Sequence, residues 1–328
     1  MSIFLTGATG FLGKNLLRRL LNDGERVSVL VRGASRLGVR HENLTVHEGD
    51  LEDRDAVAGA MRGATQVYHV AAAVKEWVKD WSVFDRVNVA AYEQLLNIAA
   101  DEGALRIVHT SSFMALGHSD GPGIGDETMP RDPDHFHNPY ERTKFLAQQI
   151  DEKFIQRGAP IVVVQPGVIF GPGEVTEGNI VVVMLRDMAT GKFPGIPGHG
   201  GQRWCYSFVD DVVEGHLLAM SKGRVGESYV LGGDNVTLDE LVDLASKHLG
   251  RKVPRRHLPL GLLRVSARMM EWGARLTGKP PMLTAGKVGV LEHNWAYSSE
   301  KAVRELGYRP TPFPKALGKR WRGCVPRA

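Results

Sequence analysis

The chain has 328 residues, of which 43% are hydrophobic and 24% charged, and its formal net charge is +4. These values are ordinary for a globular protein with one large domain, or one large and one small, and they exclude a disordered or fibrous chain. No run of basic residues is dense enough to predict a nucleic-acid or membrane surface. Two cysteines allow at most one disulfide, no apolar stretch reaches the length of a membrane span, and no secretory signal precedes the first predicted strand, so we expect a cytoplasmic protein.

The first half of the chain alternates short apolar runs, which predict strands, with longer amphipathic stretches, which predict helices. The predicted strands cover residues 3–6, 27–31, 44–47, 66–70, 106–110 and 161–164. The predicted helices cover residues 11–21, 53–61, 84–101 and 139–156. Continuous apolar strands separated by helices indicate a parallel sheet covered on both faces, and hence a doubly wound α/β fold of Rossmann type.

This regularity ends after the sixth predicted strand. Glycine and proline crowd residues 171–178 and 191–201, as is typical of loops. A strand and a helix return over 206–220, and residues 237–240 form a capping box for a further helix that ends at Gly250. We expect a cofactor-binding domain of residues 1–170 plus 204–230, and a smaller substrate-capping domain of residues 171–203 plus 231–328. Ligands would bind between the two, beyond the carboxyl ends of the strands.

The segment after the first predicted strand reads Thr-Gly-Ala-Thr-Gly-Phe-Leu-Gly. Its glycines suit a dinucleotide-binding turn, because Gly7 permits the tight turn, Gly10 lets the backbone approach a pyrophosphate, and Gly13 lets helix and strand pack closely. The free N–H groups at the start of the next helix would then meet the phosphates. The remaining cofactor contacts predicted in this turn are Thr9, Phe11 and Leu12.

The end of the second predicted strand indicates which dinucleotide is used. Where an NAD enzyme carries a carboxylate for the ribose hydroxyls, this chain has Val31 followed by Arg32, with Arg36 nearby. A carboxylate repels a 2′-phosphate, whereas an arginine binds it through charge-assisted hydrogen bonds. We therefore predict NADP as the cofactor, with NAD as the less favoured alternative. Asp50 and Leu51, after the third strand, are expected beside the adenine.

The glycine turn, together with the segment Asn-Pro-Tyr-Glu-Arg-Thr-Lys at 138–144, resembles the extended short-chain dehydrogenase/reductases. More narrowly, the chain looks like the branch that contains dihydroflavonol 4-reductase-like and hopanoid-associated sugar epimerase-like proteins. The similarity runs nearly end to end. It implies that Ser112, Tyr140 and Lys144 are the catalytic residues. It also implies further cofactor contacts from Val70, Ala71, Ala72, Thr110, Pro166, Gly167, Val168 and Ile169.

The chemistry of the implied catalytic residues is consistent with their spacing. Residues four apart share a helix face, so Tyr140 and Lys144 should point into the same cleft. The resemblance implies that Ser112 binds the substrate oxygen, that Tyr140 transfers a proton, and that Lys144 also binds the nicotinamide ribose. We expect the Lys144 ammonium and the positive charge of an oxidised nicotinamide to lower the pKa of Tyr140 from about 10 toward neutrality.

Three functions remain open: an NADPH-dependent reductase of ketones or aldehydes, a sugar-nucleotide epimerase or dehydratase that retains NAD, and a catalytically idle cofactor-binding protein. The intact catalytic set disfavours the third. Phe113 and Met114 stand where related dehydratases carry an acidic pair, and Trp204 stands where sugar-nucleotide enzymes place an arginine, although Arg203 is only one residue away. With Trp77, these side chains predict a small-molecule carbonyl substrate that is fairly apolar.

Other candidates are assigned to ordinary structural roles. His135 and His137 lie in a segment rich in Pro, Asp and Asn, and no third ligand of suitable spacing is evident, so we expect a solvated loop and no metal. His69 and His109 lie within apolar strands and are expected in the core. The predicted helices 84–101 and 139–156 correspond to those that pair between subunits in many members of the family, so we predict a homodimer with no nucleic-acid partner.

Overall fold

The computed structural model describes residues 2–120, 123–172 and 180–319, apart from the side chains of Arg36 and Ile180. Its centre is a seven-stranded parallel sheet of order β10-β6-β5-β4-β1-β2-β3. The strands are β1 (Ser2–Thr6), β2 (Arg26–Val31), β3 (Leu44–Glu48), β4 (Gln66–His69), β5 (Arg106–Thr110), β6 (Ile161–Pro166) and β10 (Ser228–Leu231). The chain order reverses between β1 and β4, which confirms the predicted doubly wound fold and marks the edge where ligands bind in such sheets.

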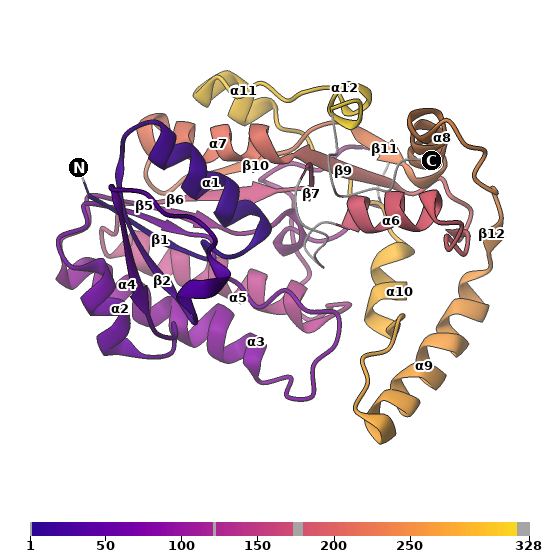
Figure 1. Ribbon diagram of the computed structural model, residues 1–328, viewed down its shortest axis with the longest axis horizontal. Coiled ribbons are helices and arrows are strands. Elements are labelled where there is room, and N and C mark those ends of the chain that lie inside the picture. Colours follow the sequence, from indigo (N-terminus) through magenta and orange to yellow (C-terminus); the bar gives the residue numbers. More distant parts are fainter. Residues whose placement is uncertain (1, 121–122, 173–179, 320–328) are drawn as a thin grey trace.

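Helices cover both faces of this sheet (Figure 1). One face carries α1 (Phe11–Asn22) and α7 (Val209–Lys222), and the other carries α2 (Arg54–Met61), α4 (Ala91–Asp101) and α5 (Pro139–Gln156). Each side has its own cluster of buried apolar side chains. The inner strands β1, β5 and β6 are almost wholly buried because both of their faces are covered, whereas the edge strand β3 is largely exposed.

The predicted helix at 84–101 is interrupted. It begins as the single turn α3 (Val83–Asp85), widens into a π-helical turn η2 (Arg86–Ala90), and becomes regular only in α4. Asn88 lies in the π turn, where its side-chain amide donates to the carbonyl of Ala73 and to the hydroxyl of Thr143. A π turn redirects a side chain without ending the helix, and here it turns an amide into the interior.

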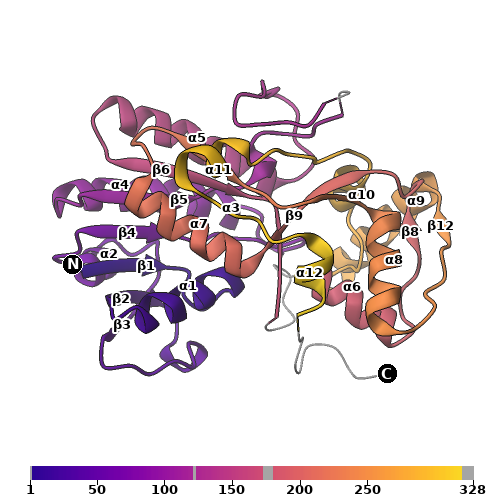
Figure 2. The same ribbon diagram turned by 90° about the horizontal axis from the view of Figure 1, so that it is seen from above.

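A second group of elements lies beyond the carboxyl edge of the sheet (Figure 2). Strands β7 (Val168–Phe170), β9 (Arg203–Phe208) and β11 (Asn235–Thr237) form a three-stranded sheet, and β8 (Ile196–Pro197) pairs with β12 (His257–Leu258). The helices here are α6 (Ile180–Ala189), α8 (Leu238–Leu249), α9 (Leu260–Thr277) and α10 (Ala285–Leu291). Two helices near the end of the chain pack on earlier elements: α11 (Glu300–Leu306) contacts α7, and α12 (Phe313–Leu317) contacts β9. The predicted domain boundaries stay a prediction.

Local signals in this second group act as predicted. Thr237 caps α8 by accepting from the N–H of Glu240, whose carboxylate accepts from the N–H of Thr237, and Gly250 ends the helix in the left-handed conformation. Of the two glycine-rich stretches, residues 173–178 of the first lie outside the described residues, as does Cys324. Among the helices that the structure describes, none is long and apolar enough to cross a bilayer.

Candidate active site

The glycine turn after β1 is shaped by the space available to it. Gly7 has a φ of +75°, and a Cβ added there would lie 2.7 Å from the backbone nitrogen of Ala71. A Cβ at Gly13 would lie 2.1 Å from the carbonyl oxygen of Gly7. Gly10 begins α1 without a side-chain cap, and the first turn of the helix has no acidic residue. The first N–H groups of α1, in the segment that includes Phe11 and Leu12, are therefore available to an anion such as a pyrophosphate.

The predicted cofactor segment 70–72 lies directly against this turn. The Thr6 hydroxyl accepts from the N–H groups of Val70 and Ala71, both at 3.2 Å, and lies 3.0 Å from Nδ1 of His69. The N–H of Ala73 donates to the Asn88 side chain at 2.7 Å. One buried hydroxyl thus ties the end of β4 to the end of β1, at the point where the strand order reverses.

Arg32 follows β2 and is exposed, and among the described residues it has no acidic partner. The nearby Glu48 carboxylate accepts from the N–H of Ala34 at 2.8 Å. Asp50 accepts from the N–H of Glu52, in a local turn. The side chain of Arg36 lies outside the described residues. The Arg32 guanidinium is therefore exposed and free of an acidic partner at the end of β2, as far as the described residues go.

The predicted catalytic residues come from two neighbouring elements. Asn138 caps α5 by accepting from the N–H of Glu141, and Pro139 occupies the first turn, so Tyr140 and Lys144 follow one turn apart. Lys144 is buried, and its Nζ donates to the carbonyl of Thr110 at 2.7 Å. Ser112, just beyond β5, accepts from the N–H of Met114 at 3.2 Å and is close enough to Tyr140 to lower its pKa through a hydrogen bond.

Burial dominates the proton affinities of these groups. It raises the pKa of Tyr140 to about 12, against the opposing hydrogen bond from Ser112. It lowers the pKa of Lys144 to about 8, with the Asp151 carboxylate acting in the opposite direction. For the protein's own side chains, desolvation of the phenolate is the largest effect on the Tyr140 pKa. The predicted lowering, which included the charge of an oxidised nicotinamide, stays a prediction.

Behind Lys144 lies a buried polar cluster that the sequence analysis did not predict as a unit. The Tyr92 ring stacks on both His69 and His109, with centroid distances of 4.7 and 4.2 Å, and the two imidazole rings are 5.7 Å apart. Nδ1 of His109 lies 2.7 Å from the Asp151 carboxylate, which also accepts from the Tyr92 hydroxyl. Both histidines are buried as predicted, and burial lowers the pKa of each. The available signal was Asp151 itself, two turns after Lys144 on the same face of a helix.

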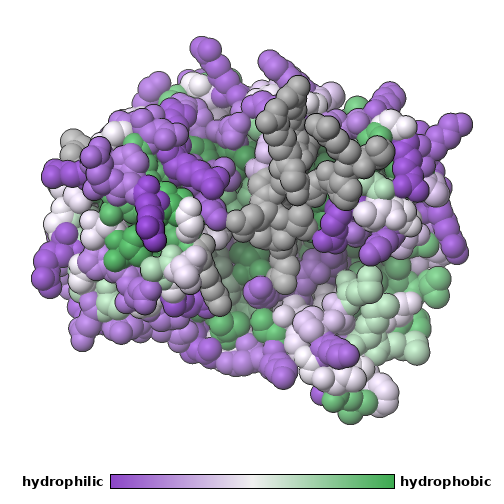
Figure 3. Space-filling view, viewed as in Figure 1, coloured by the Kyte–Doolittle hydropathy of each residue, from purple (hydrophilic) through white to green (hydrophobic). Residues whose placement is uncertain are grey.

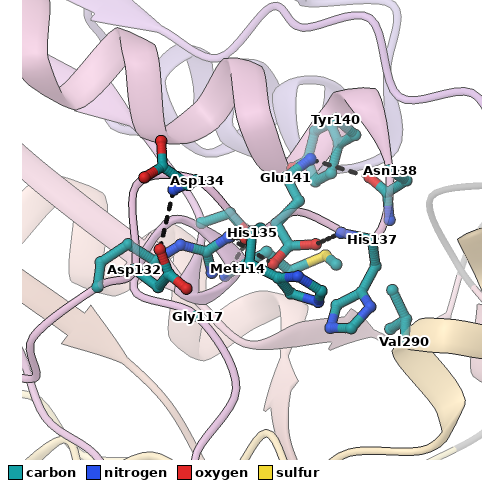
Figure 4. Close-up of polar contacts among 12 residues, drawn as sticks. Met114, Gly117, Asp132, Asp134, His135, His137, Asn138, Tyr140, Glu141 and Val290 are labelled. Atoms are coloured by element: carbon teal, nitrogen blue, oxygen red, sulfur yellow. Dashed lines mark hydrogen bonds and ion pairs between the residues drawn. The ribbon is translucent and has the colours of Figure 1, made fainter.

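A buried ion pair holds the start of α5 (Figure 4). The Glu141 carboxylate accepts from Arg131 at 2.8 Å and from the N–H of His137, also at 2.8 Å. The same Arg131 donates to the carbonyl of His135 and lies over the Phe136 ring, 4.6 Å from its centroid. These contacts fasten the 131–137 segment to the first turn of the helix that carries Tyr140. Sequence reasoning missed them, because an arginine ten residues away gives no periodic signal.

The expectation that His137 lies in a solvated loop without further ligands needs correction. The structure brings it to His118 and His293, so that one nitrogen of each ring lies within 4.8 Å of the others. The His118 and His293 rings are stacked at 4.2 Å and 21°, and Nδ1 of each ring faces the same carboxylate oxygen of Asp120. Burial and the neighbouring rings lower the pKa of His137 to about 4. His135 lies exposed beside this cluster.

The predicted substrate-side residues differ in position. Phe113 is buried edge-on against Trp295 and Tyr297, at 5.7 and 5.8 Å. Trp204 is buried in the same apolar cluster, and its indole nitrogen has no partner among the described residues. Met114 packs partly against this cluster. Trp77 is separate, in the loop between β4 and α3. Neither Trp295 nor Tyr297 was predicted from the sequence, because both come from the far end of the chain.

The remaining predicted cofactor residues join the two sheets. Pro166 ends β6, and the N–H of Gly167 donates to the Ser207 hydroxyl at 3.1 Å. A Cβ at Gly167 would lie 2.4 Å from the carbonyl oxygen of Cys205. Val168 and Ile169 continue into β7, which pairs with β9. These four predicted residues therefore lie where the central sheet meets the three-stranded sheet.

Comparison with known proteins agrees with this geometry. The model of the NAD dependent epimerase/dehydratase family matches residues 3–232. A protein of Synechocystis sp., provisionally named a dihydroflavonol 4-reductase, is 32% identical over 96% of this chain and 92% of its own. Sterol demethylase protein B of Methylococcus capsulatus is 32% identical over 95% of this chain and 94% of its own. The crystal structure of gox2253 has a TM-score of 0.83 at 32% identity and covers 99% of each chain. The chain belongs to the NAD dependent epimerase/dehydratase family, among the extended short-chain dehydrogenase/reductases.

Proposed function

We propose that this protein is an NADPH-dependent reductase that transfers a hydride to a ketone or aldehyde of a fairly apolar substrate. The observation that carries the proposal is the apolar surroundings of Ser112: the Phe113 side chain that follows it packs on the buried Trp295 and Tyr297, and no acidic pair follows the serine. A sugar nucleotide has many hydroxyl groups that need polar partners, whereas a hydrocarbon ring system needs contact area. Two relatives carry names that refer to a sterol and a dihydroflavonol, which are compounds of that kind.

The residues at the carboxyl edge of the sheet fit a dinucleotide. The turn at Gly7 and Gly10 would accept the pyrophosphate at the start of α1, and Arg32 would bind the 2′-phosphate. Lys144 would bind the nicotinamide ribose. When bound, NADPH supplies the hydride.

The chain's own residues then supply orientation and a proton. Ser112 and Tyr140 would hydrogen-bond the substrate oxygen and hold the carbonyl in place. The Tyr140 hydroxyl donates its proton to that oxygen as the hydride reaches the carbon. Burial raises the pKa of Tyr140 to about 12, so the phenol is protonated at neutral pH, as a proton donor must be, and is a weaker acid than a free phenol. In the reverse direction, the positive charge of the oxidised nicotinamide would assist loss of that proton.

The second candidate is an epimerase or dehydratase that keeps NAD through each cycle, and the family description itself favours it. The two candidates differ in cofactor. A charge-assisted contact from Arg32 contributes about 1.5–3 kcal/mol, so NADPH should bind roughly 10- to 100-fold more tightly than NADH. The variant Arg32→Ala should lose most of that difference by weakening NADPH alone. Arg62→Ala, at another exposed arginine, is the matched control.

Fluorescence titration with both cofactors tests this, followed by turnover on a panel of aromatic and aliphatic carbonyls. Tyr140→Phe should lower the rate at least about 10²-fold and leave cofactor binding intact. Equal or tighter binding of NADH, or NAD that stays bound through dialysis, would overturn the reductase assignment in favour of the epimerase. Near-normal turnover by Tyr140→Phe would show that another group donates the proton.

A further inference from the structure

Helix α9 exposes its apolar side to solvent. Only Ala267 and Ala274 of its 18 residues are buried. Its exposed apolar side chains recur every three or four residues: Leu262 (58%), Val265 (58%), Met269 (70%), Trp272 (67%) and Leu276 (69%). Met282, just after the helix, is 86% exposed. A surface helix of a globular protein normally turns such a stripe toward the core, so this arrangement is inverted.

The stripe faces away from the body of the protein. At 100° per residue its five side chains fall within an arc of about 80°, opposite the two buried alanines. Figure 1 shows α9 extending from the rest of the molecule at the lower right, and in Figure 3 hydrophobic surface appears in the same region. Large contiguous apolar surface of this kind marks an interaction site.

Positive charge runs along one side of the stripe. Arg264, Arg268 and Arg275 lie on its flank by the same helical geometry, and all three are exposed. Arg264 pairs with Glu292, but among the described residues Arg268 and Arg275 have no acidic partner. Glu271 is the single acidic residue of the helix, and it accepts from the N–H of Ala285.

The charge continues past the end of α9. A Cβ at Gly278 would lie 3.2 Å from Nζ of Lys79, so this lysine reaches the helix end from the loop after β4. Lys279 follows and is also exposed. We call this surface the α9 face. It combines the apolar stripe of Leu262, Val265, Met269, Trp272 and Leu276 with the flanking positive charges of Arg264, Arg268, Arg275, Lys79 and Lys279.

We propose that the α9 face docks onto a bilayer that contains anionic lipid. The helix would lie in the plane of the interface, with Trp272 and Leu276 among the acyl chains and the arginines at the headgroups. An apolar stripe carrying tryptophan with a flanking row of cations is complementary to that surface. A second copy of the chain would instead bring the same cations together. The basic residues form no dense run in the sequence and align only along the helix.

The docked surface reaches the loop that carries Lys79. That loop also holds Trp77, which we predict to border the substrate pocket, and the exposed Trp81. If the proposed function is right, the enzyme takes an apolar substrate held in the membrane. Docking itself needs no turnover, so it is tested independently of the reductase proposal.

The test is co-sedimentation of the full chain with vesicles of phosphatidylcholine alone and of phosphatidylcholine with phosphatidylglycerol. We expect the wild type to sediment with the anionic vesicles and to remain mostly unbound in the presence of phosphatidylcholine vesicles. The double variant Trp272→Ser/Leu276→Ser should lower the partition coefficient at least about tenfold. Leu105→Ser, at an equally exposed leucine on the other group of elements, should have no effect.

Charge-reversal variants measure the electrostatic contribution to vesicle binding. Arg268→Glu/Arg275→Glu should also lower binding at least about tenfold, whereas Arg62→Glu should change it far less. The tryptophan emission of the wild type should shift to shorter wavelength on binding, and this shift should shrink in the Trp272 variant. Failure of the wild type to bind, or unchanged binding by both α9 variants, overturns the proposal. If light scattering without vesicles shows that the wild type is an oligomer and that the α9 variants are not, the α9 face instead binds a second copy of the chain.

Discussion

The ion pair between Arg131 and Glu141 gives the sharpest test of how the catalytic helix is held. Both side chains are buried, with exposed fractions of 9% and 1%. The variant Glu141→Gln keeps the shape of the side chain but leaves the guanidinium without a counter-ion. Removing one partner of a buried pair costs about 3–5 kcal/mol, because the remaining charge stays desolvated. That is a large part of the total stability of about 5–15 kcal/mol expected for a folded domain.

Urea unfolding measures this loss. The matched control is Arg54→Met, which breaks the exposed pair with Asp101 and should cost less than about 1 kcal/mol. The double variant Arg131→Met/Glu141→Gln removes both charges and should recover at least about 2 kcal/mol relative to the sum of the two single changes. If Glu141→Gln costs no more than Arg54→Met, or if the double variant is fully additive, the pair does not hold the helix as we argue.

Two further outcomes follow from the glycine turn and from a buried histidine. Gly7→Ala should cost at least about 2 kcal/mol and impair NADPH binding, because its Cβ would meet the 70–71 backbone. Gly24→Ala shares the positive φ but has open space and should cost only about 1 kcal/mol, so equal losses in urea unfolding would contradict the role of close approach. Burial lowers the pKa of His216 to about 4. Its stabilising contribution is complete above pH 6.5, where the His216 imidazole is neutral in both the folded and the unfolded chain. That contribution is lost as the pH falls from 6.5 to 4, by up to about 3 kcal/mol. The variant His216→Gln should flatten that part of the pH dependence of the unfolding free energy, and an unchanged profile would exclude His216 as its source.

The sequence alone determined the features that depend on a few neighbouring residues. Helix α5 begins and ends as predicted, because Asn138 and Pro139 set its start. The capping box at Thr237 and the turn at Gly7 are likewise local. The six predicted strands lie within a residue or two of their predicted ends, since each contains a short apolar run. Together these signals were enough for the doubly wound fold, and the resemblance of the glycine turn and of the 138–144 segment to known enzymes indicated the family.

The tertiary structure decided whatever depends on which distant segments meet. Three histidines from separate parts of the chain stack together, and Arg131 reaches Glu141 across the loop before α5. The pKa of Tyr140 is raised because burial, which no spacing reveals, outweighs its neighbours. In α9 the periodic pattern is present in the sequence, but the pattern is the same whether the apolar side faces the core or the solvent. Only packing chooses between the two, and here it buries the alanine side and leaves the apolar stripe exposed.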